Sequence, residues 1–269
     1  MTINNYRVYQ HGLIWCGAPH IEQELSVKDC LVLLSYHKKA LFIRNIYDFD
    51  CKEPTSFWYI IQDKPIYLEN LHSKCRNQVR KSYKELNFRI IDNYRGCLNE
   101  LFQVYSSAFE RYKIKTTPMS IEQYSNYLST LSKSVSFWGA FEKTTDKLVA
   151  YAEVLIQSNS AKYTALKAIP EYMNKTYPFY GLLFEMNKYY IEEKKMLYVT
   201  DGARSITEHS NIQSFLEKFN FRRAYCHLRV TYVWWLKTVI NILYPFRKLF
   251  GNSKLGYLLR FEAINRNEY

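Results

Sequence analysis

The chain has 269 residues, of which 48% are hydrophobic and 23% are charged. This balance excludes a disordered protein, and the length is sufficient for a large buried core. The formal net charge of +12 favours acidic partners, which include a phosphorylated cofactor, RNA and an anionic membrane. Aromatic residues make up 17% and include 25 tyrosines, so some rings are expected in grooves or at interfaces.

Six cysteines are spread along the chain without a CxxC pair or a histidine at metal-ligand spacing, so the sequence predicts no metal site. Most of them lie in or beside apolar runs, and the first ten residues, MTINNYRVYQ, lack the apolar core of a secretion signal. These features predict reduced thiols and a cytoplasmic protein. Because no run of about 18 apolar residues occurs, we expect no membrane-spanning helix.

The first half of the chain predicts strands around one helix. The predicted elements are two strands within residues 30–47 joined by a turn at 37–39, a strand at 57–62, a helix within 66–86 and a strand at 88–92. The stretch 93–96 follows the last of these strands and ends in glycine, which makes it the best candidate for a domain boundary.

The predicted helix within 66–86 carries a basic stripe. Arg76, Arg80 and Lys84 recur every fourth residue, and residues 74–89 hold six Lys or Arg against one Glu. Like charges at this spacing repel one another, so a bound anion would relieve the repulsion. The stripe is therefore either an anion-binding surface or a solvated helix face.

The second half predicts an alternation of helices and strands. The predicted elements are a helix at 97–112, a helix ending at 131, strands at 135–141, 147–157 and 161–169, a helix at 178–195, a strand at 196–201, a helix from 210 and strand material at 222–235. Short polar turns separate the three consecutive strands, which indicates an antiparallel meander.

Polar residues are concentrated directly after the predicted strand 196–201. The apolar run Leu197–Val199 is followed by Thr-Asp-Gly, and a polar loop then leads to Ser210, which has the N-cap spacing to Gln213. Within eleven residues this stretch holds Asp201, Arg204, Glu208, His209 and Asn211. A plain connection does not require so many polar groups, so we expect a binding or catalytic site here.

The order of elements in the second half resembles the GNAT acyltransferase superfamily. Within it, SKCRNQVRKSYKELNFRII at 73–91 and DGARSITEHSNIQSFLEKFNFRRAY at 201–225 are similar to the FemABX-like branch. The resemblance implies an α/β fold with a mixed, mainly antiparallel sheet flanked by helices, in two tandem GNAT-like halves. It suggests a partial half at 1–95 that includes the basic helix, a complete acyltransferase domain at 96–235 and an amphipathic extension at 236–269.

The resemblance also implies where a donor would bind. In GNAT enzymes the fourth and fifth strands separate, the pantetheine arm bonds to the open strand edge, and the start of the next helix binds the pyrophosphate. Here the separation would fall between 161–169 and 196–201. The implied acyl-CoA contacts are Ala165, Lys167, Ala168, Tyr180 and Gly181.

The family's glycine-rich phosphate loop is replaced in this chain by EYMNKTYPFYG, in which only Gly181 allows a close approach. The FemABX-like branch also tends to lack that loop, and some of its members use aminoacyl-tRNA. For such a donor, the basic stripe of Arg76, Arg80 and Lys84 would follow the phosphates.

The implied reaction is attack of an amine on a thioester or ester carbonyl, which requires a base for the ammonium proton. Asp201 at the strand end is one candidate base and His209 is the other, because the pKa of histidine lies near neutrality. Arg204 could pair with a substrate carboxylate or phosphate. Further substrate contacts are assigned to Tyr112, Tyr151 and Asn211.

One role of the family has no matching residue here. In many GNAT enzymes a Tyr early in the helix after the fifth strand protonates the leaving thiolate, whereas this chain has Phe-Leu at that place. Tyr198 or Tyr225 could supply the proton instead. If Asp201 only ends a strand and Arg204 only forms a surface ion pair, the fold would serve as a non-catalytic binding module.

The segment after the last predicted strand, WLKTVINILYPFRKLFGNSK, has apolar side chains on one helical face and Lys237, Asn241 and Lys248 opposite them. Such a helix either packs on the core or lies in a membrane interface. In the second case the protein would be peripheral to the inner face of the membrane, and the amine acceptor would be a lipid-linked or cell-envelope precursor rather than a soluble small molecule.

Overall fold

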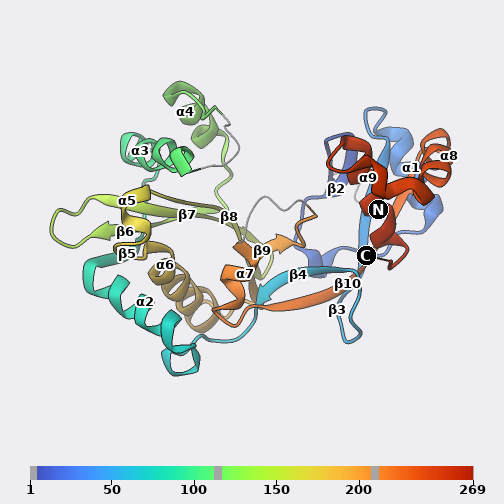
Figure 1. Cartoon of the computed structure of the whole chain (residues 1–269). Helices are drawn as coiled ribbons and strands as arrows, with labels where there is room; N and C mark the ends of the chain where they lie inside the picture. Colours follow the sequence, from blue (N-terminus) through green and yellow to red (C-terminus); the bar gives the residue numbers. More distant parts are fainter. Residues whose placement is uncertain (1–4, 112–116, 207–211, 269) are drawn as a thin grey trace. The chain divides into compact units, whose positions relative to one another are not determined.

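The computed structural model describes residues 5–111, 117–206 and 212–268 (Figure 1). These residues form two compact units. Unit 1 lies within 1–60, 203–211 and 223–269, and unit 2 within 61–202 and 212–222. The chain therefore passes between the units several times, a division that does not follow the three consecutive segments expected from the sequence.

Unit 1 has a sheet of mixed direction with helices around it. Its strands pair in the order β1 (Tyr6–Tyr9), β2 (Gly12–Trp15), β3 (Phe42–Cys51), β10 (Arg222–Tyr232) and β4 (Phe57–Gln62). Its helices are η2 (Pro19–Ile21), α1 (Val27–Tyr36), α8 (Trp234–Leu243), η6 (Tyr244–Phe250) and α9 (Lys254–Asn265). β1 is antiparallel to β2, β2 is parallel to β3, and β3 is antiparallel to β10.

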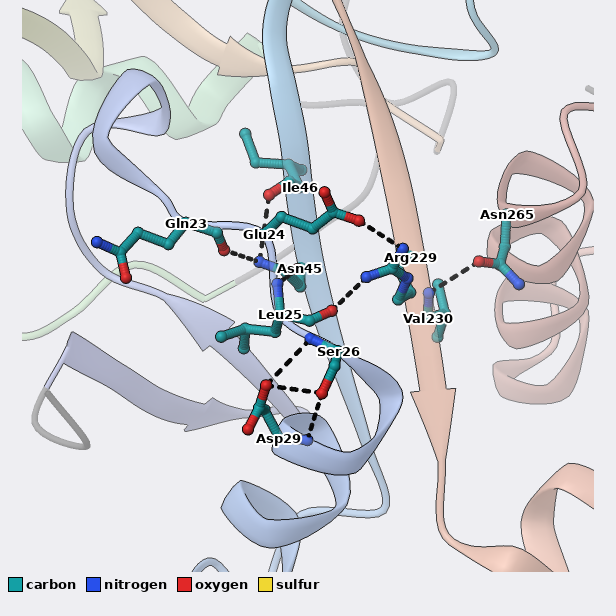
Figure 2. Close-up of polar contacts among 10 residues, drawn as sticks. All are labelled: Gln23, Glu24, Leu25, Ser26, Asp29, Asn45, Ile46, Arg229, Val230 and Asn265. Atoms are coloured by element: carbon teal, nitrogen blue, oxygen red, sulfur yellow. Dashed lines mark hydrogen bonds and ion pairs between the residues drawn. The ribbon is translucent and has the colours of Figure 1, made fainter. Parts of the chain in front are cut away.

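Polar contacts hold the segment before α1 against β3 and β10 (Figure 2). The buried Asn45 side chain accepts a hydrogen bond from the Leu25 amide at 2.8 Å and donates one to the Gln23 carbonyl at 2.9 Å. Arg229 on β10 donates to the Leu25 carbonyl and pairs with Glu24 at 2.7 Å. These contacts fix the position at which α1 begins.

The prediction of two strands within residues 30–47 is half wrong, because the first of them is helix α1. Ser26 and Asp29 form a capping box, in which the Asp29 amide donates to Ser26 Oγ at 3.1 Å and the Ser26 amide donates to Asp29 Oδ2 at 3.3 Å (Figure 2). This cap satisfies two amides at the helix start, so it favours helix over strand for the apolar run that follows. The hairpin β1–β2 was not predicted either.

Unit 2 contains the predicted meander. Its strands pair in the order β9 (Tyr198–Ala203), β8 (Ser160–Ala168), β7 (Leu148–Gln157), β6 (Val135–Glu142) and β5 (Leu86–Ile90). Its helices are η3 (Leu68–Asn70), α2 (Ser73–Glu85), α3 (Leu98–Ala108), η4 (Phe109–Arg111), α4 (Ile121–Thr130), α5 (Pro170–Met173), α6 (Pro178–Asn187), η5 (Lys188–Glu193) and α7 (Ile212–Glu217). β5 to β8 are antiparallel, and β8 is parallel to β9. The predicted fold class, a mixed and mainly antiparallel sheet flanked by helices, is confirmed.

Helices cover both faces of the unit 2 sheet (Figure 1). On one face α3 and α4 pack Leu101, Tyr124 and Leu128 against Phe137 of β6. On the other face α6 and η5 pack against the sheet, and α2 packs against α6. Within the described residues, no helix is both long and apolar enough to cross a membrane.

Candidate functional site

β8 and β9 of unit 2 pair only at their beginnings. The parallel register joins Ser160 to Tyr198, Ala161 to Val199 and Lys162 to Thr200. It ends there, although β8 continues to Ala168 and β9 to Ala203. The two strands therefore separate one residue before Asp201, as predicted, and the second part of β8 has an edge that β9 leaves unpaired.

The register of β7 and β8 shows which backbone groups face this edge. The Ile169 amide donates to the Val149 carbonyl at 2.9 Å, so these two residues form a hydrogen-bonded pair. Hydrogen-bonded and non-hydrogen-bonded pairs alternate along an antiparallel ladder. Leu166 and Ala168, which pair with Ala152 and Ala150, therefore direct their amides and carbonyls toward the side left open by β9.

Asp201 is the first residue of β9 beyond the paired segment. It is half-buried, and its carboxylate has no hydrogen bond or ion pair to another described residue. Burial raises the pKa of Asp201 to about 7, and the positive charge of Lys162 opposes this rise. A carboxyl group with a pKa near neutrality can accept and release a proton under physiological conditions, which is a property of catalytic bases.

Gly202 fixes the backbone after Asp201. Its φ of +105° is a conformation that L side chains rarely adopt, and its amide donates to Thr200 Oγ1 at 2.9 Å. The predicted end of this strand at Asp201 is wrong, because β9 continues through Gly202 to Ala203, and glycine permits the unusual backbone conformation within the strand.

Tyr163 is the first residue of β8 beyond the paired segment, and sequence analysis missed it. Lys162 and Thr200 are partners, so by alternation Tyr163 and Asp201 lie together on the opposite face of the sheet. Tyr163 is only 2% exposed, yet its hydroxyl has no hydrogen-bond partner among the described residues. Burial, together with the nearby Tyr190 and Asp201, raises the pKa of Tyr163 well above its usual range, so the phenol stays protonated.

The other face of β8 holds a closed network of hydroxyl groups. Tyr127 donates to Glu153 Oε2 at 2.6 Å, and Thr164, at a bulge in β8, donates to the other oxygen of Glu153. The hydroxyl of Tyr151, a predicted substrate contact, accepts a hydrogen bond from Tyr124 at 3.1 Å and is buried. These hydroxyl groups therefore form hydrogen bonds to one another and to Glu153 within the core.

The predicted donor contacts are distributed over three places. The backbone amide and carbonyl of Ala168 point to the unpaired edge of β8. The amides and carbonyls of Ala165 and Lys167 point to β7. The Lys167 ammonium lies 5.0 Å from the centre of the Phe109 ring. At Gly181 the close approach is made by the ring of Phe88, which fills the space that a Cβ would occupy.

The remaining predicted site residues lie elsewhere. In unit 1, Arg204 donates from Nη1 to the Ser56 carbonyl at 2.7 Å and from its amide to the Trp58 carbonyl at 2.8 Å. Arg80 and Lys84 are exposed on α2, and Arg76 is half-buried beside them. Tyr112, His209 and Asn211 lie outside the described residues.

A basic pocket lies at the start of α2 in unit 2. It has a volume of about 160 Å³ and is lined by His72, Lys74, Cys75, Gln78, Tyr180 and Lys218. The side chain of the N-cap residue His72 does not cap the helix, and the first amides of a helix favour anions. The pocket wall contains two lysines beside this helix start, and the predicted donor contact Tyr180 is also part of it. The sequence did not predict this combination, because Lys218 comes from a distant segment.

One group of side chains in the described residues has the spacing of metal ligands. Asp48 and Cys51 of β3 and His227 of β10, all in unit 1, offer ligand atoms within 4.8 Å of one another. Sequence spacing could not reveal this group, because His227 lies far from Asp48 and Cys51 in the chain. None of the three belongs to the gap beside Asp201.

No protein-family model matches the sequence, and no curated protein does. Among solved structures, FemX is similar with a TM-score of 0.54 and 11% identity over 79% of this chain and 78% of FemX. L-PGS from Bacillus licheniformis has a TM-score of 0.55 and 12% identity, and covers 97% of this chain and 84% of its own.

A third similar structure is the C-terminal domain of a putative lysylphosphatidylglycerol synthetase from Agrobacterium fabrum. Its TM-score is 0.52 with 10% identity, over 83% of this chain and 78% of that domain. At such identities the likeness concerns the fold. The predicted resemblance to the GNAT-like fold of the FemABX-like branch is confirmed at this level, and the chemistry has to be argued from the residues.

Proposed function

We propose that this protein transfers an acyl or aminoacyl group to an amine in the gap between β8 and β9, with Asp201 as the general base. The observation that carries this proposal is the end of the β8–β9 register one residue before Asp201. The gap offers backbone groups to an extended donor on one strand and a carboxylate of raised pKa on the other. The fold shared with FemX gives the same proposal support by analogy.

In the proposed step, the nitrogen lone pair of the acceptor attacks the donor carbonyl carbon and forms a C–N bond. The bond from that carbon to the leaving sulfur or oxygen breaks. Asp201 removes the proton that the amine loses, and the leaving group takes up a proton as it departs. The transfer is direct, without a covalent enzyme intermediate.

Tyr163 is proposed as the donor to the developing negative charge. Its hydroxyl is buried on the same sheet face as Asp201 and lacks a partner among the described residues. Its raised pKa keeps the proton on the oxygen. A preorganised O–H group in a buried place stabilises an oxyanion or a leaving group more strongly than water does.

The favoured donor is an acyl-CoA. The pantetheine arm contains two amides, and Leu166 and Ala168 offer amides and carbonyls along the unpaired edge of β8. An extended chain that adds to a strand edge is recognised by such backbone hydrogen bonds. The acceptor is proposed to be an amine on a small molecule or a cell-envelope precursor.

A second candidate donor is aminoacyl-tRNA. The basic pocket at the start of α2 supports it, because Lys74, Lys218 and a helix N-terminus without a side-chain cap together suit phosphate groups. One structure of similar fold is a domain of a putative lysylphosphatidylglycerol synthetase. The product in that name is a phospholipid that carries an aminoacyl group. By fold analogy, a lipid-linked acceptor belongs with this candidate.

The donor can be identified by thermal-shift titration of the full chain with acetyl-CoA, longer acyl-CoAs and charged tRNA. A ligand at one hundred times its Kd stabilises the folded state by about 2.7 kcal/mol, which gives a measurable shift. Asp201→Asn should bind the same donor, because the carboxylate acts on the acceptor, but should transfer about a hundredfold or more slowly. If no donor shifts the transition, the fold serves as a non-catalytic binding module instead.

A further inference from the structure

The exposed apolar side chains of this protein are concentrated in unit 1. Apart from Tyr67 and Leu197, every large hydrophobic side chain that is exposed in the described part of the chain belongs to that unit. Scattered exposed hydrophobic residues are normal, whereas a contiguous group marks an interaction site. The distribution therefore requires an explanation specific to unit 1.

α8 and η6 are apolar on two opposite sides. Leu236, Ile240 and Tyr244 are buried in the core of unit 1, where they pack with α9 and β10. The exposed side carries Trp234, Trp235, Val239, Ile242, Phe246 and Leu249. One side of this segment therefore packs on the core, as the first alternative expected, and the other side is uncovered.

α1 has an uncovered apolar side of the same kind. Cys30, Leu33 and Leu34 are buried in the cluster beneath it. Its exposed side carries Val27, Leu31, Val32 and Tyr36. Val233, the residue before α8, packs against the same buried cluster, so α1 and the start of α8 are neighbours within unit 1.

The polar contacts around these helices show that the exposed sides are set by the fold. Arg229 and Asn45 hold the segment before α1, and Asn265 of α9 accepts a hydrogen bond from the Val230 amide at 2.9 Å (Figure 2). α9 in turn packs against α8 and η6. Rotation of α1 would break the contacts of Asn45 and Arg229, and displacement of α9 would break its hydrogen bond to the Val230 amide.

The charges near this surface have one sign along α8 and η6. Residues 234–250 include Lys237, Arg247 and Lys248 and no Asp or Glu. Lys237 and Lys248 are exposed, and the long apolar stems of lysines let their ammonium groups reach phosphates while the stems lie along apolar surface. Protein–protein interfaces are depleted in lysine, whereas tryptophan with lysine or arginine is the combination found at membrane interfaces.

We propose that unit 1 docks on an anionic lipid bilayer through this lipid-facing surface, which comprises the exposed sides of α1, α8 and η6. The tryptophans and aliphatic side chains enter the interfacial region, and the lysines contact anionic headgroups. This proposal does not depend on the transfer reaction, because it concerns unit 1 and uses no residue of the gap between β8 and β9.

The test measures sedimentation of the full chain with vesicles of phosphatidylcholine mixed with phosphatidylglycerol, and with vesicles of phosphatidylcholine alone. We expect binding to the anionic vesicles that weakens severalfold when NaCl rises from about 0.1 M to about 1 M, because the screening length falls from about 10 Å to about 3 Å. Absence of binding to anionic vesicles at low salt would overturn the proposal.

A matched pair of variants distinguishes binding through this surface from non-specific hydrophobic adsorption to vesicles. Trp234→Ser with Leu249→Ser removes two side chains that are both 81% exposed, so folding should be unaffected, and vesicle affinity should fall about tenfold or more. The control, Tyr67→Ser with Leu197→Ser, removes side chains that are 51% and 52% exposed in unit 2 and should bind as the wild type does. Equal loss in both variants would contradict the proposal.

Two further measurements identify the occupant. Brominated lipid should quench the tryptophan emission of the wild type and not that of W234F with W235F, since these rings are the ones expected in the bilayer. Sedimentation velocity without lipid should show a monomer. A dimer that the variant Trp234→Ser with Leu249→Ser abolishes would assign the surface to a second copy of the chain and overturn the assignment to lipid.

Discussion

Lys162 and Thr200 form the last pair that joins β8 to β9, and Tyr163 and Asp201 follow them on the opposite face of the sheet. Two adjacent strands thus stop pairing at the point where a buried hydroxyl and a half-buried carboxyl group meet the resulting gap. In a strand pair that continued, these side chains would be neighbours in a ladder. Here they border the place where the proposed donor and acceptor meet.

The pH dependence of transfer should report the ionisation of Asp201. Its pKa is about 7, and a base must be deprotonated to act, so kcat should rise about tenfold per pH unit below 7 and level off above. Asp201→Asn should lower kcat by about 10² to 10⁴ and remove the inflection. Lys162→Gln should move the inflection to higher pH, because the lysine lowers this pKa. An unchanged inflection in Asp201→Asn would exclude Asp201 as the base.

The same carboxyl group should make the wild type less stable at high pH. Its pKa is near 3.8 when unfolded and about 7 when folded, so the folded state binds the proton more tightly. The free energy of unfolding therefore falls as the pH rises from about 4 to about 7. Asp201→Asn avoids this loss and should be more stable than the wild type at pH 8 by about 2 to 4 kcal/mol in urea titrations, with little difference near pH 4.

Asp146 provides a control, because its pKa is lowered in the folded state whereas that of Asp201 is raised. Its hydrogen bonds to Arg89 lower the pKa of Asp146, so its charge favours the folded state above pH 4. Asp146→Asn should therefore be no more stable than the wild type at pH 8. If Asp201→Asn is also no more stable than the wild type at pH 8, the folded protein does not destabilise the ionised carboxyl group of Asp201.

Tyr163→Phe should separate stability from activity. The change removes a buried hydroxyl that has no described partner, so the free energy of unfolding should stay the same or rise by about 1 kcal/mol, while kcat falls about tenfold or more. Tyr151→Phe is the matched control on the other face. It breaks the bond to Tyr124 and should lower the free energy of unfolding by about 1 kcal/mol. A destabilised Tyr163→Phe with full activity would point to a structural role.

The basic pocket and the basic stripe on α2 can be distinguished by RNA binding. If the pocket holds phosphates, Lys74→Gln with Lys218→Gln should reduce tRNA affinity about tenfold and lower the slope of affinity against salt concentration. Arg80→Gln with Lys84→Gln removes the same charge from the exposed stripe and should have a smaller effect. The reverse order would assign RNA to the stripe.

Local patterns in the sequence were sufficient to predict much of unit 2. The apolar run before Thr200 and the short polar turns of the meander specify strands through side-chain spacing. The strand was therefore predicted, but its end was not, because β9 continues past Asp201 to Ala203. The separation of the two strands followed from the resemblance to the GNAT fold.

The missed features depend on residues distant in the chain. Tyr163 meets Asp201 only through the parallel register of two strands, and Lys218 joins His72 only in the folded protein. The error at α1 has a local cause. An apolar run such as CLVLLSY suits a buried strand or a helix equally, and the capping spacing from Ser26 to Asp29 was the signal that decides between them.

The most direct test of the central claim is residue-resolved hydrogen exchange at β8 with and without the donor found by titration. The amides of Leu166 and Ala168 face the unpaired edge, whereas the amide of Lys167 faces β7 and serves as the internal control. We predict faster exchange at Leu166 and Ala168 than at Lys167 in the free protein, and slowing at both when the donor binds. Protection of Leu166 and Ala168 that is already complete without a donor, or that a saturating donor leaves unchanged, would contradict binding in the gap.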